Sequence, residues 1–551
     1  MTVAVAAPHR VAVAAAEAAV AEGGNALDAA LAAAALLVVA YPHQCALGGD
    51  LTALVRDPDG EVTAVLSLGA APAAVDVEAL RALGERMPKG GPLSVTVPGI
   101  VAGWQELAGL GAALGLRAPL LRAAAAAADG VEVVPGLERA IAERAEAVAS
   151  DPGLRDVFTD ADGPLAAGAT LRQPALAATL EALAHDPAQM YEGEIAAAIV
   201  AFLQAGGSAM TTDDFAAHAA ERPEPLTRSE GEVTWWAAPP PSQGATVMAL
   251  LGPSDPVAVD LTGAIGGLGR PPAVGGGLGR PRGGPLARAR AAQAARGRLL
   301  GDPRGGEIDV AGMIDPAVEP AGVAPPRGAG DTVSITAVDD EGRSVALIQS
   351  NFQTFGAGLL EPRTGVVLHN RGSYFSLVPG HPAEIGPGRR PPHTLCPLLG
   401  ERAASAEGAS AGDRSAASDA PAAPAANPVV RAAIGCQGGS AQPLILSQIA
   451  AAAVDTDASL EAALAAPRWV VGDRELGYEA ETVLAEPGAE TRLQPELAAA
   501  GAPPLVIGSA REDRCGHVQI SRDLGAGKLE AAADPRADGA GVVTPSRKEN
   551  A

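Results

Sequence analysis

The feature that most constrains the fold is a strand-turn-strand pattern in the second half of the chain. Strand-forming residues run over Val333–Val338 and again over Ser344–Gln349, and the turn-forming sequence Asp-Asp-Glu-Gly lies between them at 339–342. Two such runs joined by a short glycine-containing turn predict an antiparallel hairpin. Pairing across it would bring together the side chains of Thr332, before the first strand, and Ser350, after the second.

Thr332 would gain useful chemistry if the bond between Asp331 and Thr332 were broken. A hydroxyl is a weak nucleophile at neutral pH, but a free α-amino group on the same residue, with a pKa of about 8, can accept its proton. Cleavage would therefore create a nucleophile that needs no separate histidine. Because a threonine at the start of an ordinary strand is a common alternative, the functional interpretation depends on the surrounding sequence.

Length and composition allow a large enzyme. The 551 residues suffice for three or four domains of ~150 residues or for one large layered domain. The chain is 48% hydrophobic but only 3% aromatic, so its core must consist mainly of Ala, Val and Leu. A net charge of −24 disfavours nucleic acid and anionic membranes as partners and indicates an ordinary acidic surface. The partner we expect is a small-molecule substrate.

The cysteines and the N-terminus indicate a reducing compartment. The four cysteines are scattered, with no C-x-x-C pair and no His/Cys grouping, so we expect free thiols, no metal site and no cofactor. Residues 1–10 lack the features of a secretory signal. The apolar stretch 29–41 is too short to cross a bilayer and predicts a buried helix. We therefore expect a cytoplasmic protein.

The pattern along the chain predicts alternating helices and strands. A helix is expected over Val11–Glu22, ended by two glycines, and a second from residue 25 to Val39. A hairpin is expected from Leu51–Val55 and Val62–Leu66, and Ala-rich helices over 116–205.

Two glycine-, proline- or serine-rich stretches, 263–285 and 403–426, indicate exposed linkers or insertions, the second of low complexity. Neither has the strand, loop and helix context of a phosphate-binding loop.

Nine short blocks stand in a characteristic order along nearly the whole chain. They include Gly-Gly-Asn-Ala-Leu-Asp-Ala-Ala at 23–30, Tyr-Pro-His at 41–43, Val-Pro-Gly-Ile-Val-Ala-Gly-Trp at 97–104 and Gly-Cys-Gln-Gly-Gly-Ser at 435–440. The others are at 239–244, 355–358, 365–372, 466–469 and 534–536. In this order they resemble the γ-glutamyltransferase family of N-terminal-nucleophile hydrolases.

This resemblance implies an α+β fold, a four-layer αββα sandwich with two central sheets between helical layers. It also implies a precursor that cuts itself before Thr332, giving a large subunit of residues 1–331 and a small subunit of residues 332–551. The two would form a heterodimer around one shared core, and such heterodimers can pair in turn.

The same resemblance assigns roles at the reaction centre. The residue matching Ser350 would orient the nucleophile. Backbone N–H groups at Gly438 and Gly439 would stabilise the oxyanion, an interaction whose loss typically costs about 3 kcal/mol. A tight turn is the structural alternative for the two glycines.

The expected glutamate-binding residues are mostly replaced. The family's arginine clamp for a carboxylate is missing from Leu66–Pro72. Other contacts to the ends of a γ-glutamyl group match Phe352, Arg371, Tyr374 and the pair His393-Thr394. We therefore expect an altered, more apolar and narrower pocket, and we doubt that glutathione is the natural substrate. Arg371 could bind a carboxylate from another direction or be a surface or structural arginine, and His393 could be a packed loop residue.

Three functions remain open from the sequence. The first is a threonine-nucleophile hydrolase or acyltransferase that acts on an amide through an acyl-enzyme. The second is a relative that cleaves a non-amide bond, such as a carbon–carbon bond next to a carbonyl. The third is a non-catalytic scaffold, which has no need to retain Thr332, Ser350, Gly438 and Gly439 together.

Overall fold

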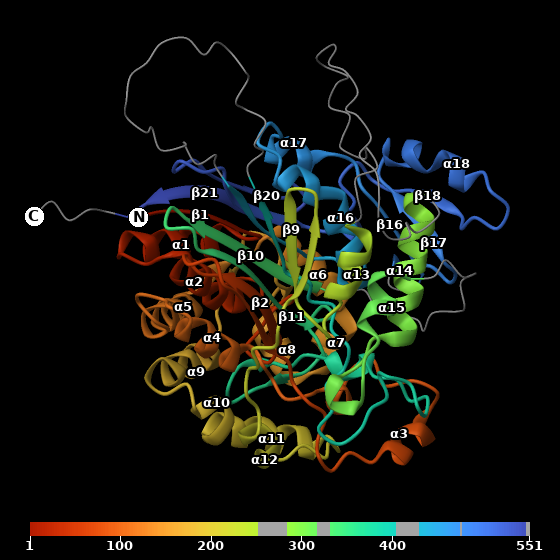
Figure 1. The fold of residues 1–551 in the computed structure, drawn as a ribbon. Helices are drawn as coiled ribbons and strands as arrows, with labels where there is room; N and C mark the ends of the chain where they lie inside the picture. The colour runs from red at the N-terminus through yellow and green to blue at the C-terminus, as the bar shows by residue number, and fades with distance from the viewer. Residues whose placement is uncertain (252–283, 317–330, 404–428, 474–475, 547–551) are drawn as a thin grey trace, which may run out of the picture.

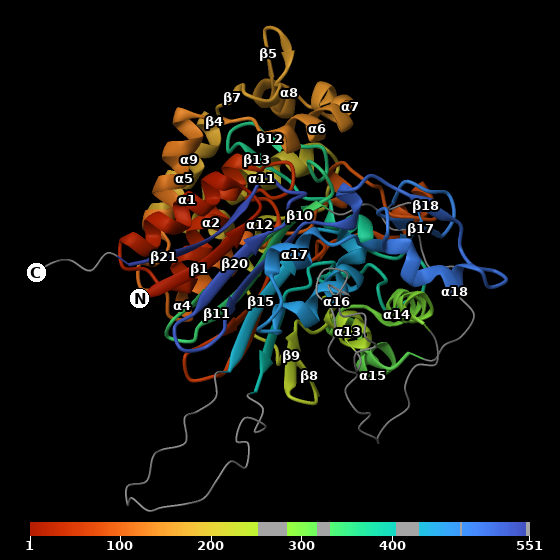
Figure 2. The same ribbon diagram turned by 90° about the horizontal axis from the view of Figure 1, so that it is seen from above.

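The computed structural model describes residues 1–251, 284–316, 331–403, 429–473 and 476–546. Two six-stranded sheets lie face to face at its centre, and a layer of helices covers the outer face of each sheet (Figures 1 and 2). The expected α+β sandwich of four layers is therefore confirmed.

The first sheet contains the predicted 333–349 hairpin at its centre, as β10 and β11. All of its neighbouring strands are antiparallel, and its order is β21-β1-β10-β11-β2-β3. The bounds are β21 (Ala540–Pro545), β1 (Thr2–Ala7), β10 (Asp331–Asp339), β11 (Ser344–Phe352), β2 (Asp50–Arg56) and β3 (Val62–Ser67). The second predicted hairpin is β2 and β3.

The second sheet has the order β20-β19-β15-β14-β9-β8, again antiparallel. Its strands are β20 (Leu529–Ala533), β19 (Val518–Asp523), β15 (Val430–Cys436), β14 (Leu398–Arg402), β9 (Val233–Ala237) and β8 (Leu226–Glu230). Each sheet therefore combines strands from before and after the Asp331–Thr332 bond.

Small and aliphatic side chains fill the space between the two sheets. One buried cluster joins them and contains no buried aromatic residue: Ala4, Leu54, Ala64, Val338, Ala346, Leu399, Ala433 and Leu529. Across the same interface the hydroxyls of Thr336 and Ser521 are 3.0 Å apart. The low aromatic content of the chain is thus consistent with a core that alanine and leucine can fill without voids.

The first helical layer includes α2, all of whose residues are buried. This layer contains α1 (Arg10–Ala21), α2 (Ala26–Ala40), α4 (Ile100–Gly109), α5 (Arg117–Asp129), α9 (Pro174–His185) and α11 (Glu194–Ala205). Asn25 caps α2 together with Asp28, whose carboxylate also accepts the N–H groups of Ala113 and Leu114. One of the sequence blocks is therefore explained by helix capping.

The second helical layer covers the other sheet. It consists of α13 (Gly244–Leu250), α16 (Gln442–Ala453) and α17 (Leu460–Ala465), with α14 (Pro285–Leu299) and α15 (Val310–Ile314) packed beside α13. A small sheet of β16 (Trp469–Gly472), β17 (Thr482–Ala485) and β18 (Leu505–Ile507) borders this layer.

Short elements connect the layers. The helices are α3 (Val77–Leu83), α6 (Pro135–Glu143), α7 (Ala145–Ser150), α8 (Pro152–Phe158), α10 (Gln189–Glu192), α12 (Thr212–Ala216) and α18 (Gln494–Leu497). The strands are β4 (Val131–Glu132), β5 (Thr159–Asp160), β6 (Gly163–Pro164), β7 (Thr170–Leu171), β12 (Leu360–Glu361) and β13 (Val366–Val367).

A buried network of ion pairs between side chains connects the small sheet to the second large sheet. Arg468 pairs with Asp534 at 2.5 Å, and Asp534 pairs with Arg536 at 3.0 Å. Arg536 in turn pairs with Glu486 at 2.5 Å. Breaking one partner of such a network leaves an uncompensated buried charge, which typically costs ~3–5 kcal/mol. The blocks at 466–469 and 534–536 therefore have a structural explanation.

Several further expectations can be compared with the structure. All four cysteines are buried and free. In the ranges described above, no helix is long and apolar enough to span a bilayer, and no cluster of acidic, histidine or cysteine side chains could hold a metal ion. The expected linkers at 263–285 and 403–426 lie outside the described residues except at 284–285 and 403, and Pro285 already begins α14.

Replacing Leu399 by alanine tests the packing between the sheets. Leu399 is 2% exposed, so the variant leaves a cavity that its neighbours fill only partly, and we expect a loss of about 3 kcal/mol in the free energy of unfolding. Chemical denaturation provides the measurement. Leu83→Ala, at a residue 66% exposed, is the matched control, and an equal loss in both variants would contradict this packing.

Candidate active site

A β-bulge at the start of β10 places the Thr332 side chain. Asp331 is paired with Phe352, and Val333 with Gln349, so two residues of β11 stand opposite Thr332 alone. A bulge of this kind bends the strand and re-aims a side chain, and such bulges are common beside active sites.

Three hydroxyl and carbonyl groups form a continuous hydrogen-bond path at this bulge. The Thr332 hydroxyl donates to Ser350 Oγ at 3.3 Å, and the Ser350 hydroxyl donates to the backbone carbonyl of Asp331. Ser350 Oγ also accepts the N–H of Phe352 at 2.7 Å. Thr332 is 1% exposed and Ser350 is fully buried. The expected contact between Thr332 and Ser350 is therefore confirmed, and it extends to the carbonyl of the bond that cleavage would break.

Phe352 has a backbone conformation that is unusual for a residue with a side chain. Its φ is 76°, in the left-handed region, which costs ~1–3 kcal/mol for such a residue. This conformation directs its N–H back onto Ser350 Oγ. The strained backbone of Phe352 therefore helps to orient the Ser350 hydroxyl.

The glycine pair lies on the segment between β15 and α16. Gly438 has φ 145° and Gly439 has φ 51°, and Gly439 begins the 3-10 helix Gly439–Ala441. The side chains on either side reach the candidate cleavage point, because Gln437 Nε2 donates to Asp331 Oδ1 at 3.2 Å and Gln442 Nε2 to Thr332 Oγ1 at 3.5 Å. The segment that carries the glycines therefore contacts the candidate cleavage point on both sides.

Two backbone carbonyls of this segment are held by side chains from the large-subunit part of the chain. Gln243 Nε2 donates to the Gly439 carbonyl at 2.9 Å, and Arg296 Nη1 donates to the Ser440 carbonyl at 2.6 Å. Within the described part of the chain, the N–H groups of Gly438 and Gly439 have no hydrogen-bond acceptor. Two backbone donors thus remain available next to Thr332.

The residues expected to bind substrate are gathered around Arg371. Its guanidinium carbon is 4.1 Å from the centre of the Phe352 ring, and its Nη1 donates to Thr394 Oγ1 at 3.1 Å. The Phe352 and Tyr374 rings are 5.3 Å apart. The Tyr374 hydroxyl lies 3.0 Å from that of Ser440, which connects this group to the glycine segment.

Arg371 is an incompletely paired buried cation. It is 0% exposed, and its Nε and Nη2 have no hydrogen-bond partner among the described residues. Burial lowers its pKa to about 10, with opposing contributions from Asp50 and Tyr374, so the side chain stays charged at neutral pH. A surface position for Arg371, one of the open alternatives, is excluded.

Asp50 lies behind Arg371, between two buried histidines. Its Oδ2 is 3.1 Å from His369 Nδ1 and 3.2 Å from His393 Nε2, and its Oδ1 accepts the Gly69 N–H at 3.0 Å. Burial raises the pKa of Asp50, but the two histidines outweigh this effect and leave it below its usual value. Burial and the nearby Arg371 lower the pKa of His393 to about 3.

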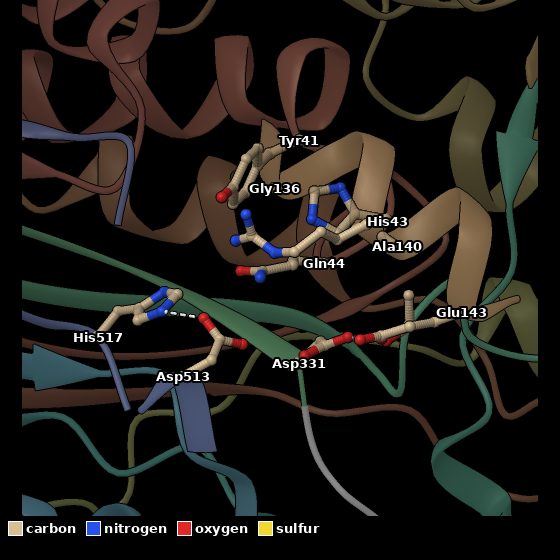
Figure 3. A pocket seen from close by; sticks show the side chains of 11 residues that line it. Tyr41, His43, Gln44, Gly136, Ala140, Glu143, Asp331, Asp513 and His517 are labelled. Carbon is tan, nitrogen blue, oxygen red and sulfur yellow. Dashed lines mark hydrogen bonds and ion pairs between the residues drawn. The ribbon is translucent and has the colours of Figure 1, made fainter. Parts of the chain in front are cut away.

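A polar pocket adjoins Asp331 (Figure 3). Its walls come from the loop after α2, from α6 and from the segment before β19: Tyr41, His43, Gln44, Gly136, Arg139, Ala140, Glu143, Asp331, Thr354, Asp513 and His517. Thr354 donates to Asp331 Oδ2. Asp513 and His517 form an ion pair at 2.7 Å in its wall.

Several residues of the site were not singled out from the sequence, namely Gln442, Gln437, Thr354, Asp50 and His369. A weak signal existed for Asp50, because a carboxylate at the start of a strand as apolar as Leu51–Val55 must find buried partners. No comparable signal exists for Gln442, since glutamine in the first turn of a helix is ordinary.

Comparison with known proteins agrees with this geometry. The model of the family described as gamma-glutamyltranspeptidase matches residues 12–266, 286–412 and 400–544. The chain belongs to the gamma-glutamyltranspeptidase family. It is therefore a member of a family of enzymes, as the order of the sequence blocks predicted.

Two curated relatives extend over almost the full length of this family member. The oxamate amidohydrolase proenzyme of Klebsiella pneumoniae is 31% identical over 97% of both chains. The glutathione hydrolase-like YwrD proenzyme of Bacillus subtilis is 30% identical over 95% of this chain and 94% of its own. Among solved structures, the cephalosporin acylase of Bacillus halodurans superposes with a TM-score of 0.79 at 26% identity, covering 100% of this chain and 96% of the acylase.

We expect this protein to lose stability in mild acid. Burial lowers the pKa of both His43 and His393 from 6.5 to about 3, so between these values the unfolded chain binds more protons than the folded one. Stability is then complete above pH 6.5 and falls as the pH drops, by up to about 1.4 kcal/mol per pH unit for each histidine. Thermal unfolding midpoints from pH 7.5 to 4.5 provide the measurement.

The matched variants are His393→Gln, which removes one buried titrating group, and His185→Gln, at an exposed position. A shallower pH dependence is expected only in the first. An unchanged slope in His393→Gln would show that His393 is not held neutral.

Proposed function

We propose that this protein is a self-processing amidohydrolase with Thr332 as its N-terminal nucleophile, acting on short amides that carry a carboxylate. The observation that carries the proposal is the hydrogen-bond path from the Thr332 hydroxyl through Ser350 to the Asp331 carbonyl. The names of the two full-length relatives, both proenzymes, support the self-processing part.

Self-cleavage follows from this path. Thr332 Oγ1 attacks the carbonyl carbon of Asp331, its proton passes to Ser350, and the Ser350 proton passes to the carbonyl oxygen. When the carbonyl re-forms, the C–N bond breaks and the amine of Thr332 takes the proton, leaving an ester between Asp331 and the Thr332 oxygen. Water hydrolyses the ester to a new carboxylate and a free Thr332 hydroxyl.

Turnover reuses the same atoms. The free α-amino group of Thr332 accepts the hydroxyl proton as the oxygen attacks the substrate amide, then supplies it to the departing amine. The N–H groups of Gly438 and Gly439, which lack acceptors among the described residues, stabilise the oxyanion. Water releases the acyl group from Thr332.

The two products of cleavage, residues 1–331 and 332–551, stay together as a heterodimer. Each central sheet contains strands of both products, and separating the products would expose the buried interface between the sheets. A further pairing of heterodimers is compatible with this arrangement.

The substrate class follows from the groups around Arg371. A glutamyl group needs partners for both a carboxylate and an ammonium, yet the rings of Phe352 and Tyr374 occupy two of the matching positions and Asp50 is engaged by two histidines. What remains is one buried cation with two unpaired nitrogens. This combination favours half-amides of short dicarboxylic acids, a class that includes oxamate, named in one relative.

Intact mass tests self-cleavage. The wild-type protein should give two fragments with a junction between Asp331 and Thr332, whereas Thr332→Ala should remain a single chain. Ser350→Ala removes the proton path and should slow cleavage by about 10²-fold or more. Finding an uncut wild-type chain would overturn the proposal and favour a scaffold.

Kinetics with matched amides test the substrate class. Oxamate and similar half-amides should be hydrolysed, and γ-glutamyl-p-nitroanilide should be turned over poorly. Arg371→Met should lower kcat/KM for carboxylate-bearing amides by about 10²-fold and should affect acetamide-type amides, which have no carboxylate, far less. Equal losses on both kinds of amide would contradict a carboxylate-binding role for Arg371.

A further inference from the structure

The side chain of Asp331 is restrained at both of its oxygens. Thr354 donates to Oδ2, and Gln437 Nε2 donates to Oδ1 at 3.2 Å. The backbone carbonyl of the same residue accepts from Ser350. Three side chains from two different segments therefore bind Asp331, the residue before Thr332. A residue that only begins a strand does not require so many side-chain hydrogen bonds.

These contacts connect the cleavage point to the oxyanion segment. Gln437 directly precedes Gly438, and its backbone N–H is held by the carbonyl of His517 at 2.9 Å. Thr354 follows β11, the strand that carries Ser350. The Asp331 carboxylate thus joins the two segments that the cleavage reaction requires.

We propose that the Asp331 carboxylate is a positioning group for self-cleavage, which as an anion accepts from Thr354 and Gln437 and so holds its own carbonyl against Ser350. The proposal rests on the self-cleavage proposed above. Asp331 acts through the orientation of its own peptide, and displacement of reacting atoms by about 1 Å can cost 10²-fold in rate.

The surroundings of Asp331 make this restraint dependent on pH. The groups that face it across the pocket are Glu143, Asp513, His517, His43, Arg139 and Tyr41. Burial, with Asp513 and Glu143 adding to it against the opposing hydrogen bond from Thr354, raises the pKa of Asp331 from 3.8 to about 6. Protonation occupies one of the two accepting oxygens, so the restraint is complete above this range and is lost as the pH falls through it.

The test follows cleavage of newly made chains. The full-length protein is synthesised in a cell-free system in a short labelled pulse, synthesis is stopped, and the chain is transferred to buffers from pH 4.5 to 8. We expect Asp331→Asn and Asp331→Ala to cleave about 10- to 100-fold more slowly than wild type at pH 7.5. The wild-type rate should also rise with pH through a step centred near pH 6, which both variants should lack.

Three control variants address structural effects. Thr354→Val should slow cleavage and Thr354→Ser should restore it, because only the latter keeps the donor. Glu143→Gln removes a neighbouring negative charge without touching the contacts of Asp331, so it should retain the rate and shift the step to lower pH. Thermal unfolding of each variant in the uncut Thr332→Ala background checks that the fold is intact.

The outcomes separate the two proposals. Wild-type rates and an unchanged pH step in both Asp331 variants would overturn the positioning role, while self-cleavage itself would stand. Absence of cleavage in the wild-type chain, or cleavage of Thr332→Ala, would overturn the proposed function instead.

Discussion

The pairing of β10 with β11 is the interaction on which the rest of the structure depends. These strands are central in the first sheet and buried over nearly their full length, so their register cannot slip without moving every side chain to the wrong face. The single irregularity is the bulge opposite Thr332. The regular pairing with one bulge places the Thr332 hydroxyl within hydrogen-bond distance of Ser350. The Ser350 hydroxyl in turn donates to the Asp331 carbonyl.

The candidate site has two parts, which differ in the kind of polar group that they contain. Around Thr332 the groups are hydroxyls, side-chain amides and backbone donors, with the Asp331 carboxylate beside them, and a proton can pass only along the two hydroxyls. Around Arg371 the guanidinium and the Asp50 carboxylate are buried charged groups, and two buried histidines contact Asp50. Because a buried cation with unpaired nitrogens is costly, this second part is best explained by an anionic ligand that completes its hydrogen bonds.

The glycine segment, the hairpin and the ion network that anchors the small sheet belong to the fold and its reaction centre. Under the proposed function, the residues around Phe352 and Tyr374 line the acyl pocket, where changes of shape would alter substrate choice without disturbing the core. Relatives named for oxamate, glutathione and cephalosporin each match this chain over nearly its full length.

Local patterns in the sequence determined a large part of this protein. The two hairpins, the first two helices and the burial of α2 followed from periodicity and turn chemistry, which act over a few residues. The contact between Thr332 and Ser350 followed from them, because hairpin pairing is local. The order of the sequence blocks indicated the family and the four layers.

The tertiary structure decided which distant residues meet. Gln437 and Gln442 reach the cleavage point only because β15 and α16 pack beside the first sheet, and Asp50, His369 and His393 converge from three separate segments. No local pattern encodes such meetings, since side-chain contacts between remote segments depend on how whole layers stack. The bulge that re-aims Thr332 likewise depends on the fit of the ladder in the packed sheet. The sequence by itself therefore determined the elements and the candidate nucleophile, and packing decided the groups that surround it.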